Sequence, residues 1–390
     1  MPNKNVPKFS GLILVSGQDR PGITQRLMQT LSQFTIKIID IEQLVIRDRL
    51  LLTVLISLDP DHAQAISDDL ALLQDEIGLD IAVDFVQHDD AKTGAETLRV
   101  VMVGDGIKPT GLASVASEIA SLGGNITAIK RTATLPNIAI ELDLTIPNES
   151  IKSVQRALAT VAVKHRIDLA VEPGGLSRAA KRIILLDMDS TLIQQEVIDL
   201  LAQHAGKAEV VSQITTKAMT GELDFTQALV QRVQLLAGLD STVLEKVRQE
   251  ITLTPGAERL IERLHEQGHK VGVVSGGFIN VIEPLLKSLK LDFYRANILE
   301  IKGGKLTGAV IGQVVDRKAK ADALSEFAKS ENVSMNQTVA VGDGANDLDM
   351  IESAGLGVAF NAKPKVAAAA ATTISNNDLS TLLLLMGISS

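Results

Sequence analysis

Two aspartates separated by a single residue are the first feature of this sequence that could do chemistry. Asp187 and Asp189 follow an apolar run at 183–186, which is typical of a strand buried on both faces of a parallel sheet. Residues i and i+2 of a strand point to the same side, so both carboxylates would lie together where open α/β sheets bind ligands. Two close carboxylates repel each other unless a cation or a shared proton offsets them, and Mg²⁺ would fit. Without further motifs, such a pair usually marks a solvated acidic turn.

Two other strand-like runs, at 271–274 and 338–341, also end in polar groups. The first is followed by the sequence SGG from Ser275, whose hydroxyl and free backbone N–H groups would form an anion site at the start of a helix. The second is followed by GDGAND, which adds carboxylates and an amide. Together with Lys320, a lysine of the kind normally solvated, these strand ends could bind a phosphate through a metal ion and transfer it to a carboxylate.

The ordered set DMDST, SGG, lysine and GDGAND is similar to the four motifs of the haloacid dehalogenase-like phosphatases. The resemblance covers about residues 180–390 and implies an α/β domain with a Rossmann-like core. It implies that Asp187 is the nucleophile that forms an aspartyl-phosphate. Asp189 would protonate the leaving oxygen and then activate the attacking water. Asp187, Asp343 and the main-chain carbonyl of Asp189 would hold Mg²⁺.

The same resemblance implies how the phosphate is bound. Ser275 and the amide of Gly276 would bind phosphate oxygens, and Lys320 would neutralise charge on the phosphate and the nucleophile. Asn346 and Asp347 would orient the lysine, the substrate or a metal-bound water.

About 80 residues between DMDST and VGVVSGG are predicted to be largely helical and would form a cap, about residues 197–252, that selects the substrate. The segments DMDSTLIQQE, MTGELDFTQALVQRV, VSGGF and AVGDGAND are similar to the branch of the family that hydrolyses O-phospho-L-serine, the last step of serine biosynthesis. That resemblance implies that Glu196 accepts the substrate ammonium and that Arg232 binds its carboxylate bidentately. Met219 and Phe225 would shield the bound substrate. Taken singly, Arg232 is typical of a solvated helix charge, and the other two of cap packing.

The N-terminal 175 residues contain an internal repeat. Gly17 and Gly22 match Gly106 and Gly111 at one constant offset, and each copy is predicted to follow the order βαββαβ. That order covers one face of a four-stranded antiparallel sheet with two helices. We therefore predict two ferredoxin-like α+β domains, at residues 1–92 and 93–175, ahead of the phosphatase-like domain at residues 180–390.

The repeat resembles the ACT domain, a small-molecule-sensing module of amino-acid metabolism. The resemblance rests on DRPGI in the first copy, which is similar to that family's strand-to-helix turn; the second copy has IKPTG there. ACT domains usually bind amino acids between copies, so the resemblance implies an amino-acid effector, with serine the natural candidate, and a homodimer formed by sheet pairing. A ferredoxin-like pair without a ligand stays open.

Composition excludes several other classes. The chain has no cysteine, which excludes disulfides, thiolate metal sites and cysteine nucleophiles. A net charge of -9, with 8 Phe, 1 Tyr and no Trp, disfavours a nucleic-acid partner. No apolar run resembles a signal peptide or a membrane span, so we expect a cytoplasmic protein without a membrane partner.

Three alternatives stay open at the level of sequence. A related phosphatase acting on another small ester would need neither Glu196 nor Arg232. A phosphotransferase would pass the phosphate to an acceptor other than water. An amino-acid sensor would have a degenerate catalytic half, and the intact acidic motifs argue against this alternative. The sequence does not decide between L- and D-phosphoserine, or between Mg²⁺ and Mn²⁺.

Overall fold

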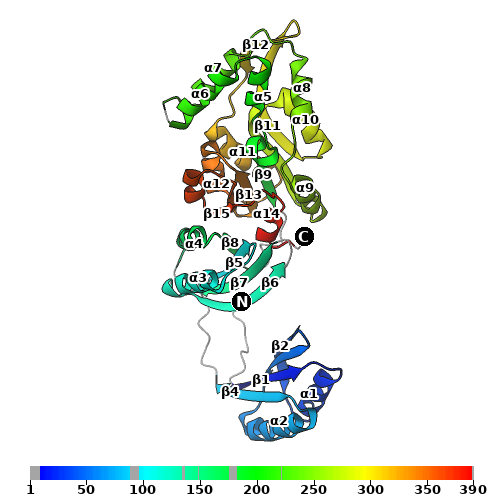
Figure 1. The fold of residues 1–390 in the computed structure, drawn as a ribbon. Helices are drawn as coiled ribbons and strands as arrows, with labels where there is room; N and C mark the ends of the chain where they lie inside the picture. Colours follow the sequence, from blue (N-terminus) through cyan, green and yellow to red (C-terminus); the bar gives the residue numbers. More distant parts are fainter. Residues whose placement is uncertain are drawn as a thin grey trace. The chain divides into compact units, whose positions relative to one another are not determined.

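The chain forms two compact units, Met1–Thr93 and Gly94–Ser390 (Figure 1). A computed structural model describes residues 9–87, 96–133, 137–147, 149–174, 182–220 and 222–388, without the side chains of Gln87, Glu96, Met219, Thr220, Pro364 and Lys365. The first unit holds one copy of the repeat. The second holds the other copy together with the phosphatase-like domain. No helix among these residues is long and apolar enough to cross a membrane.

The first copy is a four-stranded antiparallel sheet, in the order β2-β3-β1-β4, with two helices on one face. Alternation along β1 places Ile13 and Val15 in the core beneath the helices and leaves Leu12 and Leu14 on the opposite face, 46% and 39% exposed. The predicted order is confirmed: β1 (Phe9–Gln18), α1 (Ile23–Leu31), β2 (Lys37–Ile46), β3 (Arg49–Ser57), α2 (Ala63–Ile77) and β4 (Asp80–Gln87).

The second copy repeats this topology, in the order β6-β7-β5-β8. Its helix nevertheless starts earlier, at Pro109, so Gly111 lies inside the helix, whereas Gly22 precedes α1 with a left-handed φ of 94°. A Cβ on Gly111 would lie 2.6 Å from Ile167 Cδ1, so close packing accounts for this glycine. The elements are β5 (Glu96–Gly104), α3 (Pro109–Ser121), β6 (Asn125–Ala133), β7 (Ile138–Ile146), α4 (Ile151–His165) and β8 (Asp168–Pro173).

The phosphatase-like domain is built on a seven-stranded sheet in the order β12-β11-β10-β9-β13-β14-β15. All neighbouring strands are parallel except β11 and β12, which confirms the predicted Rossmann-like core. The central strand is short and fully buried, as its apolar sequence predicts. The strands are β9 (Ile183–Leu186), β10 (Lys270–Phe278), β11 (Phe293–Lys302), β12 (Lys305–Ile311), β13 (Thr338–Gly342), β14 (Leu356–Phe360) and β15 (Thr372–Ile374).

Helices cover both faces of this sheet and form the cap. One face packs on α9 (Ala257–Glu266), α10 (Ile279–Ser288) and α14 (Thr381–Leu385), and the other on α11 (Arg317–Ser330) and α12 (Leu348–Ser353). A short helix, α13 (Pro364–Ala369), precedes β15. The cap consists of α5 (Val197–His204), α6 (Ala208–Thr220), α7 (Phe225–Gln234) and α8 (Val243–Glu250), which Figure 1 shows at the end of the domain away from the second repeat copy.

The second copy packs directly on the phosphatase-like domain. Val101 and Val103, on the face of β5 away from its own helices, are fully buried in one core with leucines of α14. Beside them, the buried Asp168 of β8 accepts a hydrogen bond from the backbone N–H of Ser375, just after β15. The interface therefore combines an apolar core with a buried carboxylate.

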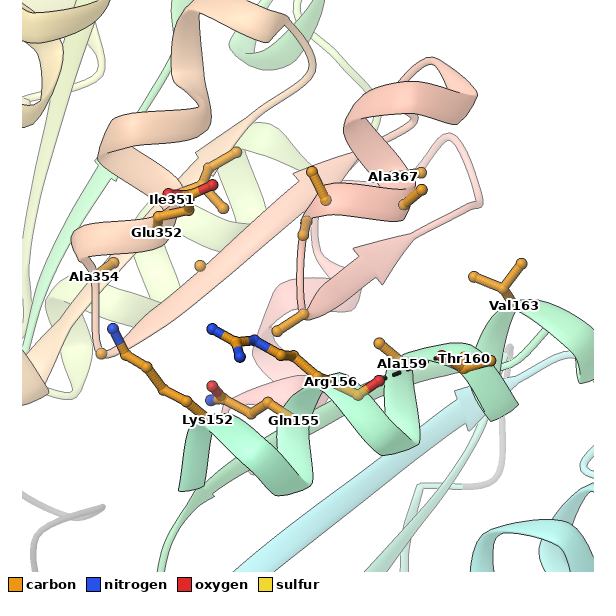
Figure 2. Close-up of a pocket in the computed structure, with 16 residues that line it drawn as sticks. Lys152, Gln155, Arg156, Ala159, Thr160, Val163, Ile351, Glu352, Ala354 and Ala367 are labelled. Atoms are coloured by element: carbon orange, nitrogen blue, oxygen red, sulfur yellow. Dashed lines mark hydrogen bonds between the residues drawn. The ribbon is translucent and has the colours of Figure 1, made fainter. Parts of the chain in front are cut away.

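A cleft with a volume of about 630 Å³ lies next to this interface, between α4 and the segments around α12 and α13 (Figure 2). Figure 2 shows Lys152 and Arg156 extending from α4 toward Glu352 and Ala354 at the end of α12. Because α12 directly follows the GDGAND loop, the second repeat copy borders a helix that leaves the acidic end of β13.

The buried Asp168 predicts a specific pH dependence of stability. Burial, partly opposed by hydrogen bonds from Ser375, raises the pKa of Asp168 to about 6. The folded chain therefore binds a proton more tightly than the unfolded chain, and the free energy of unfolding falls as pH rises from about 4 to about 6. Asp168→Asn removes this loss. The free energy of unfolding of the variant, minus that of the wild type, should therefore rise by about 2 kcal/mol when the pH is raised from about 4.5 to about 7.5, as measured by urea unfolding. An equal difference at both pH values would contradict this account.

Candidate active site

The register of three adjacent strands brings the polar strand ends together. Leu186 of β9 lies opposite Val273 of β10 on one side and Val341 of β13 on the other. The residues that follow therefore emerge at one edge of the sheet: Asp187 from the centre, Ser275 and Asp343 from the flanks. This edge is the carboxyl end of parallel strands, where the sequence predicts a site.

Lys320 of α11 is completely buried between two carboxylates. Its Nζ lies 2.6 Å from Asp187 Oδ1 and 2.7 Å from Asp347 Oδ1. Burial alone would lower the pKa of Lys320, but the two aspartates raise it overall, so the ammonium stays charged. Asp347 also accepts a hydrogen bond from the backbone N–H of Gly344, 2.9 Å from Oδ2, and so fixes the lysine in place. Asn346 lies beside Gly344, since a Cβ on that glycine would lie 2.2 Å from Asn346 Oδ1.

Three carboxylates at this edge could hold a metal ion. Oxygens of Asp187, Asp343 and Asp347 lie within 4.8 Å of one another, and Thr191 donates a hydrogen bond to Asp343. Burial raises the pKa of Asp187 well above its usual range, and the charges of Asp347, Asp343 and Asp189 add to that effect. The single positive charge of Lys320 does not balance the negative charges of these carboxylates. Hard oxygen ligands with excess negative charge fit a divalent ion such as Mg²⁺.

Asp189 is not part of that cluster and instead accepts hydrogen bonds from the first cap helix and from the SGG segment. Its Oδ1 accepts a hydrogen bond from the backbone N–H of Val197 at 2.7 Å, and its Oδ2 accepts one from Ser275 Oγ at 2.9 Å. The turn that follows β9 requires Ser190 in a left-handed conformation, with φ of 57°. Burial raises the pKa of Asp189, while these hydrogen bonds act against it. A carboxyl group that keeps a proton suits a general acid.

The SGG sequence differs in one respect from expectation. Strand β10 continues through Phe278 and α10 begins at Ile279, so the motif belongs to the strand end rather than to a first helical turn. The buried Ser275 Oγ accepts from the backbone N–H of Gly277 at 2.8 Å and donates to Asp189. A Cβ on Gly277 would lie 2.7 Å from Asp189 Oδ2, so any larger residue would displace that carboxyl.

Asn297 of β11 is a residue that the sequence reasoning missed. It is buried; its Nδ2 donates to the Gly276 carbonyl at 2.8 Å, and its Oδ1 accepts from the Val315 N–H at 2.8 Å. It therefore fixes the backbone of the SGG segment. A polar residue within the alternating apolar sequence of β11 is the signal that could have identified it.

The cap supplies the other half of the site. Phe225, the first residue of α7, packs on the SGG segment, because a Cβ on Gly276 would lie 2.9 Å from its Cζ. The capping box formed by Asp224 and Gln227 sets where α7 begins. Met219 lies in α6, but its side chain is outside the described residues.

Glu196 and Arg232 add a negative and a positive group to the cap side. Glu196 Oε1 accepts a hydrogen bond from Ser190 Oγ at 2.8 Å. Loss of hydration, together with the charge of Asp189, raises the pKa of Glu196 to about 7. Burial lowers the pKa of the half-buried Arg232, while Glu196, Asp199 and Asp189 raise it. The sequence reasoning missed Asp199, which lies one turn after Glu196 at the start of α5.

Comparisons with known families agree with this geometry. Residues 184–352 match the haloacid dehalogenase-like hydrolase family. Residues 12–84 and 96–172 each match an ACT domain.

Similar proteins share nearly the whole chain. Phosphoserine phosphatase SerB2 of Mycobacterium tuberculosis is 44% identical over 98% of this chain and 94% of its own length. The phosphoserine phosphatase of Streptomyces coelicolor is 44% identical over 97% of this chain and 92% of its own. The crystal structure of a probable phosphoserine phosphatase from Vibrio cholerae superposes with a TM-score of 0.56, at 35% identity, over 74% of this chain and 87% of that one.

The acidic cluster predicts that a divalent ion binds more weakly at low pH. Burial and the neighbouring Asp347 raise the pKa of Asp343 to about 6, so a proton competes with the ion below that value. Titration calorimetry with Mg²⁺ should give a dissociation constant about fourfold higher near pH 5.5 than near pH 7.5. Asp343→Asn should bind weakly at both values, and an affinity of the wild type that does not change with pH would contradict the assignment.

Proposed function

Because the chain belongs to the haloacid dehalogenase-like hydrolases, and within them to the phosphoserine phosphatases with paired ACT domains, we propose that it hydrolyses O-phospho-L-serine to L-serine and phosphate. One observation supports this most directly. The site offers a counter-group for each charge of phosphoserine: Lys320 for the phosphate, Glu196 for the ammonium and Arg232 for the carboxylate. This reaction would be the last step of serine biosynthesis.

In the first step, a carboxylate oxygen of Asp187 attacks phosphorus and the bond from phosphorus to the serine oxygen breaks. Asp189 gives its proton to that serine oxygen, so L-serine leaves as a neutral alcohol and Asp187 becomes an aspartyl-phosphate. Lys320 lies 2.6 Å from the nucleophile and offsets the negative charge that gathers there. Ser275 and the Gly276 amide bind phosphate oxygens.

In the second step, water attacks phosphorus, and the bond from phosphorus to the Asp187 oxygen breaks. Asp189, now ionised, takes the proton of the water, so phosphate leaves and both aspartates return to their starting states. The hydrogen bond from the Val197 N–H holds Asp189 in one orientation for both proton transfers. Ser275, which donates to Asp189 in the structure, would turn its single hydroxyl hydrogen to the phosphate when the substrate binds.

A bound Mg²⁺ would offset negative charge on the phosphate and the carboxylates. Asp187, Asp343 and the main-chain carbonyl of Asp189 are the ligands that we propose, and Asp347 adds a fourth nearby oxygen donor. Asn346 would orient the substrate or a water of the ion.

On the cap side, Glu196 accepts the substrate ammonium and Arg232 binds the carboxylate through a bidentate pair. Phe225 and Met219 would close over the serine portion and exclude water. Phe225 already packs on Gly276.

Phosphate release from a panel of esters tests the reaction and the substrate together. With Mg²⁺, O-phospho-L-serine should be preferred strongly over glucose 6-phosphate, and the rate with O-phospho-D-serine measures whether the site discriminates between the enantiomers. Asp187→Asn should lower kcat by about 10⁴-fold, because no nucleophile remains. Arg232→Met should lower kcat/KM for phosphoserine about 100-fold, because the substrate carboxylate loses its partner. Lys246→Met, which removes an exposed cation of cap helix α8, should change neither.

The other outcomes separate the alternatives. Equal activity on the sugar phosphate would keep the mechanism and remove the roles of Glu196 and Arg232. Serine released faster than phosphate, in the presence of an acceptor alcohol, would mean phosphotransfer. Absence of metal-dependent release from every ester would favour an amino-acid sensor with a degenerate catalytic half.

The first ACT domain provides the surface for the proposed homodimer. Leu12 and Leu14 are largely exposed, whereas their counterparts in the second copy, Val101 and Val103, are fully buried by the phosphatase domain. The edge strand β2 adds a row of exposed apolar residues: Ile38, Ile39, Ile41, Leu44, Val45 and Ile46. An open apolar edge of this kind pairs readily with another strand, and a second copy of this domain presents the same edge.

Sedimentation with a matched pair of variants tests this dimer and the effector. Leu14→Glu places a charge on the open face and should raise the dimer dissociation constant about 100-fold. Leu72→Glu, at a position that is 70% exposed on helix α2 of the same domain, should leave it unchanged. Added serine should shift the oligomer or the rate of the wild type. A monomeric wild type would contradict the dimer, and no response to serine would exclude serine as the effector.

We also propose that the protein acts in the cytoplasm. Its proposed substrate is a charged phosphate ester that does not cross a membrane unaided, so the enzyme must share its compartment. Fractionation of cells would test this location.

A further inference from the structure

The carboxylate-binding arginine is held in place by one hydroxyl from a neighbouring cap helix. Arg232 Nη1 donates to Thr215 Oγ1 at 3.4 Å, and its Nε donates to the Ala228 carbonyl, one turn earlier on α7, at 3.2 Å. A guanidinium has five N–H donors. The contacts that the structure describes use two of them, so the others can face a substrate.

The direction of the bond between Thr215 and Arg232 is determined by a second contact. Thr215 Oγ1 also lies 3.0 Å from the carbonyl of Val211, one turn earlier on α6. A carbonyl can only accept a hydrogen bond and a guanidinium can only donate one. The single hydroxyl hydrogen therefore goes to Val211, and an oxygen lone pair faces Arg232.

Arg232 needs such a restraint because nearby carboxylates attract it. Glu196 and Asp199 at the start of α5, and Asp189 in the core, all attract the guanidinium. Without an anchor on α6, Arg232 would move toward Glu196 and occupy the carboxylate that has to meet the substrate ammonium. Thr215 is uncharged, so it can hold the arginine without neutralising it.

We propose that Thr215 is a positioning residue that keeps Arg232 apart from Glu196, so that each can meet its own group on an amino-acid phosphate ester. The inference rests on the proposed function and extends it to a residue that does not touch the substrate. It assigns specificity for the carboxylate to a contact between two cap helices, α6 and α7.

The chain offers a matched control at the next residue. Thr216 Oγ1 donates to the Ser212 carbonyl at 2.9 Å, which is the same bond to the preceding turn, but its side chain is exposed. Thr215→Val and Thr216→Val both replace a hydroxyl by a methyl group of similar size on one helix.

Steady-state kinetics with two substrates tests the proposal. O-Phosphoethanolamine keeps the phosphate and ammonium of phosphoserine but lacks the carboxylate. Thr215→Val should raise KM for phosphoserine about tenfold and leave kcat nearly unchanged. It should raise KM for phosphoethanolamine less, because that substrate has no carboxylate to lose its partner and only its ammonium is affected. Thr216→Val should change neither KM, and Thr215→Ser, which keeps the hydroxyl, should restore the wild-type value. In an Arg232→Met background, Thr215→Val should add nothing.

Two results would overturn the proposal. One is equal KM values for phosphoserine in the two valine variants; the other is an equal rise in KM for both substrates, which would mean a general loosening of the cap.

A readout independent of activity keeps this test separate from that of the proposed function. The NMR signal of the Arg232 Nε–H group, identified by its loss in Arg232→Met, should shift in Thr215→Val and not in Thr216→Val. If the wild type does not prefer phosphoserine over phosphoethanolamine, the proposed substrate fails, and an unshifted signal would then reject Thr215 as the anchor.

Discussion

The buried ammonium of Lys320, between Asp187 and Asp347, is the interaction on which the catalytic centre depends. Removing water from an ion is costly, so a buried lysine persists only where carboxylates and good geometry compensate it. Here the two carboxylates come from the end of β9 and the loop after β13, and the lysine comes from helix α11, so three elements distant in sequence meet at one ion pair. The strand order, with β9 beside β13, keeps the two carboxylates close enough to share one cation. The carboxylates at this edge carry more negative charge than one lysine offsets. The fold fixes this excess charge in place, where a divalent ion can balance it.

Asp189, the proposed general acid, joins this core to the cap. Asp189 accepts a hydrogen bond from the N–H of Val197, the first residue of cap helix α5, so the positive end of that helix faces the carboxyl. The next residue, Ser190, uses its left-handed conformation to reach Glu196, the residue that we propose binds the substrate ammonium. One short turn thus places a proton-transfer group and a recognition group side by side, and a shift of the cap would disturb both.

Much of this arrangement is predictable from the sequence, for identifiable reasons. The apolar runs before Asp187, Ser275 and Asp343 predict strands, and parallel strands must bring their ends to one edge. What the sequence does not carry is long-range packing. Lys320 lies in a polar segment typical of solvated surface, and only the fold buries it. Asn297 and Thr215 contact backbone or side-chain groups distant in sequence, which no local pattern records. Gly22 and Gly111 align in the repeat, yet one starts a helix and the other lies within one.

The two ACT domains show what happens when one fold is duplicated within a chain. The sheet face that holds Val101 and Val103 has its covering partner on the same polypeptide, at a fixed effective concentration that dilution cannot change. The matching face with Leu12 and Leu14 has no cover among the described residues of its own compact unit, so a second chain that covered it, as proposed, would bind by association and obey mass action. The contact of one copy is therefore fixed by the chain, while the proposed contact of the other would depend on the protein concentration.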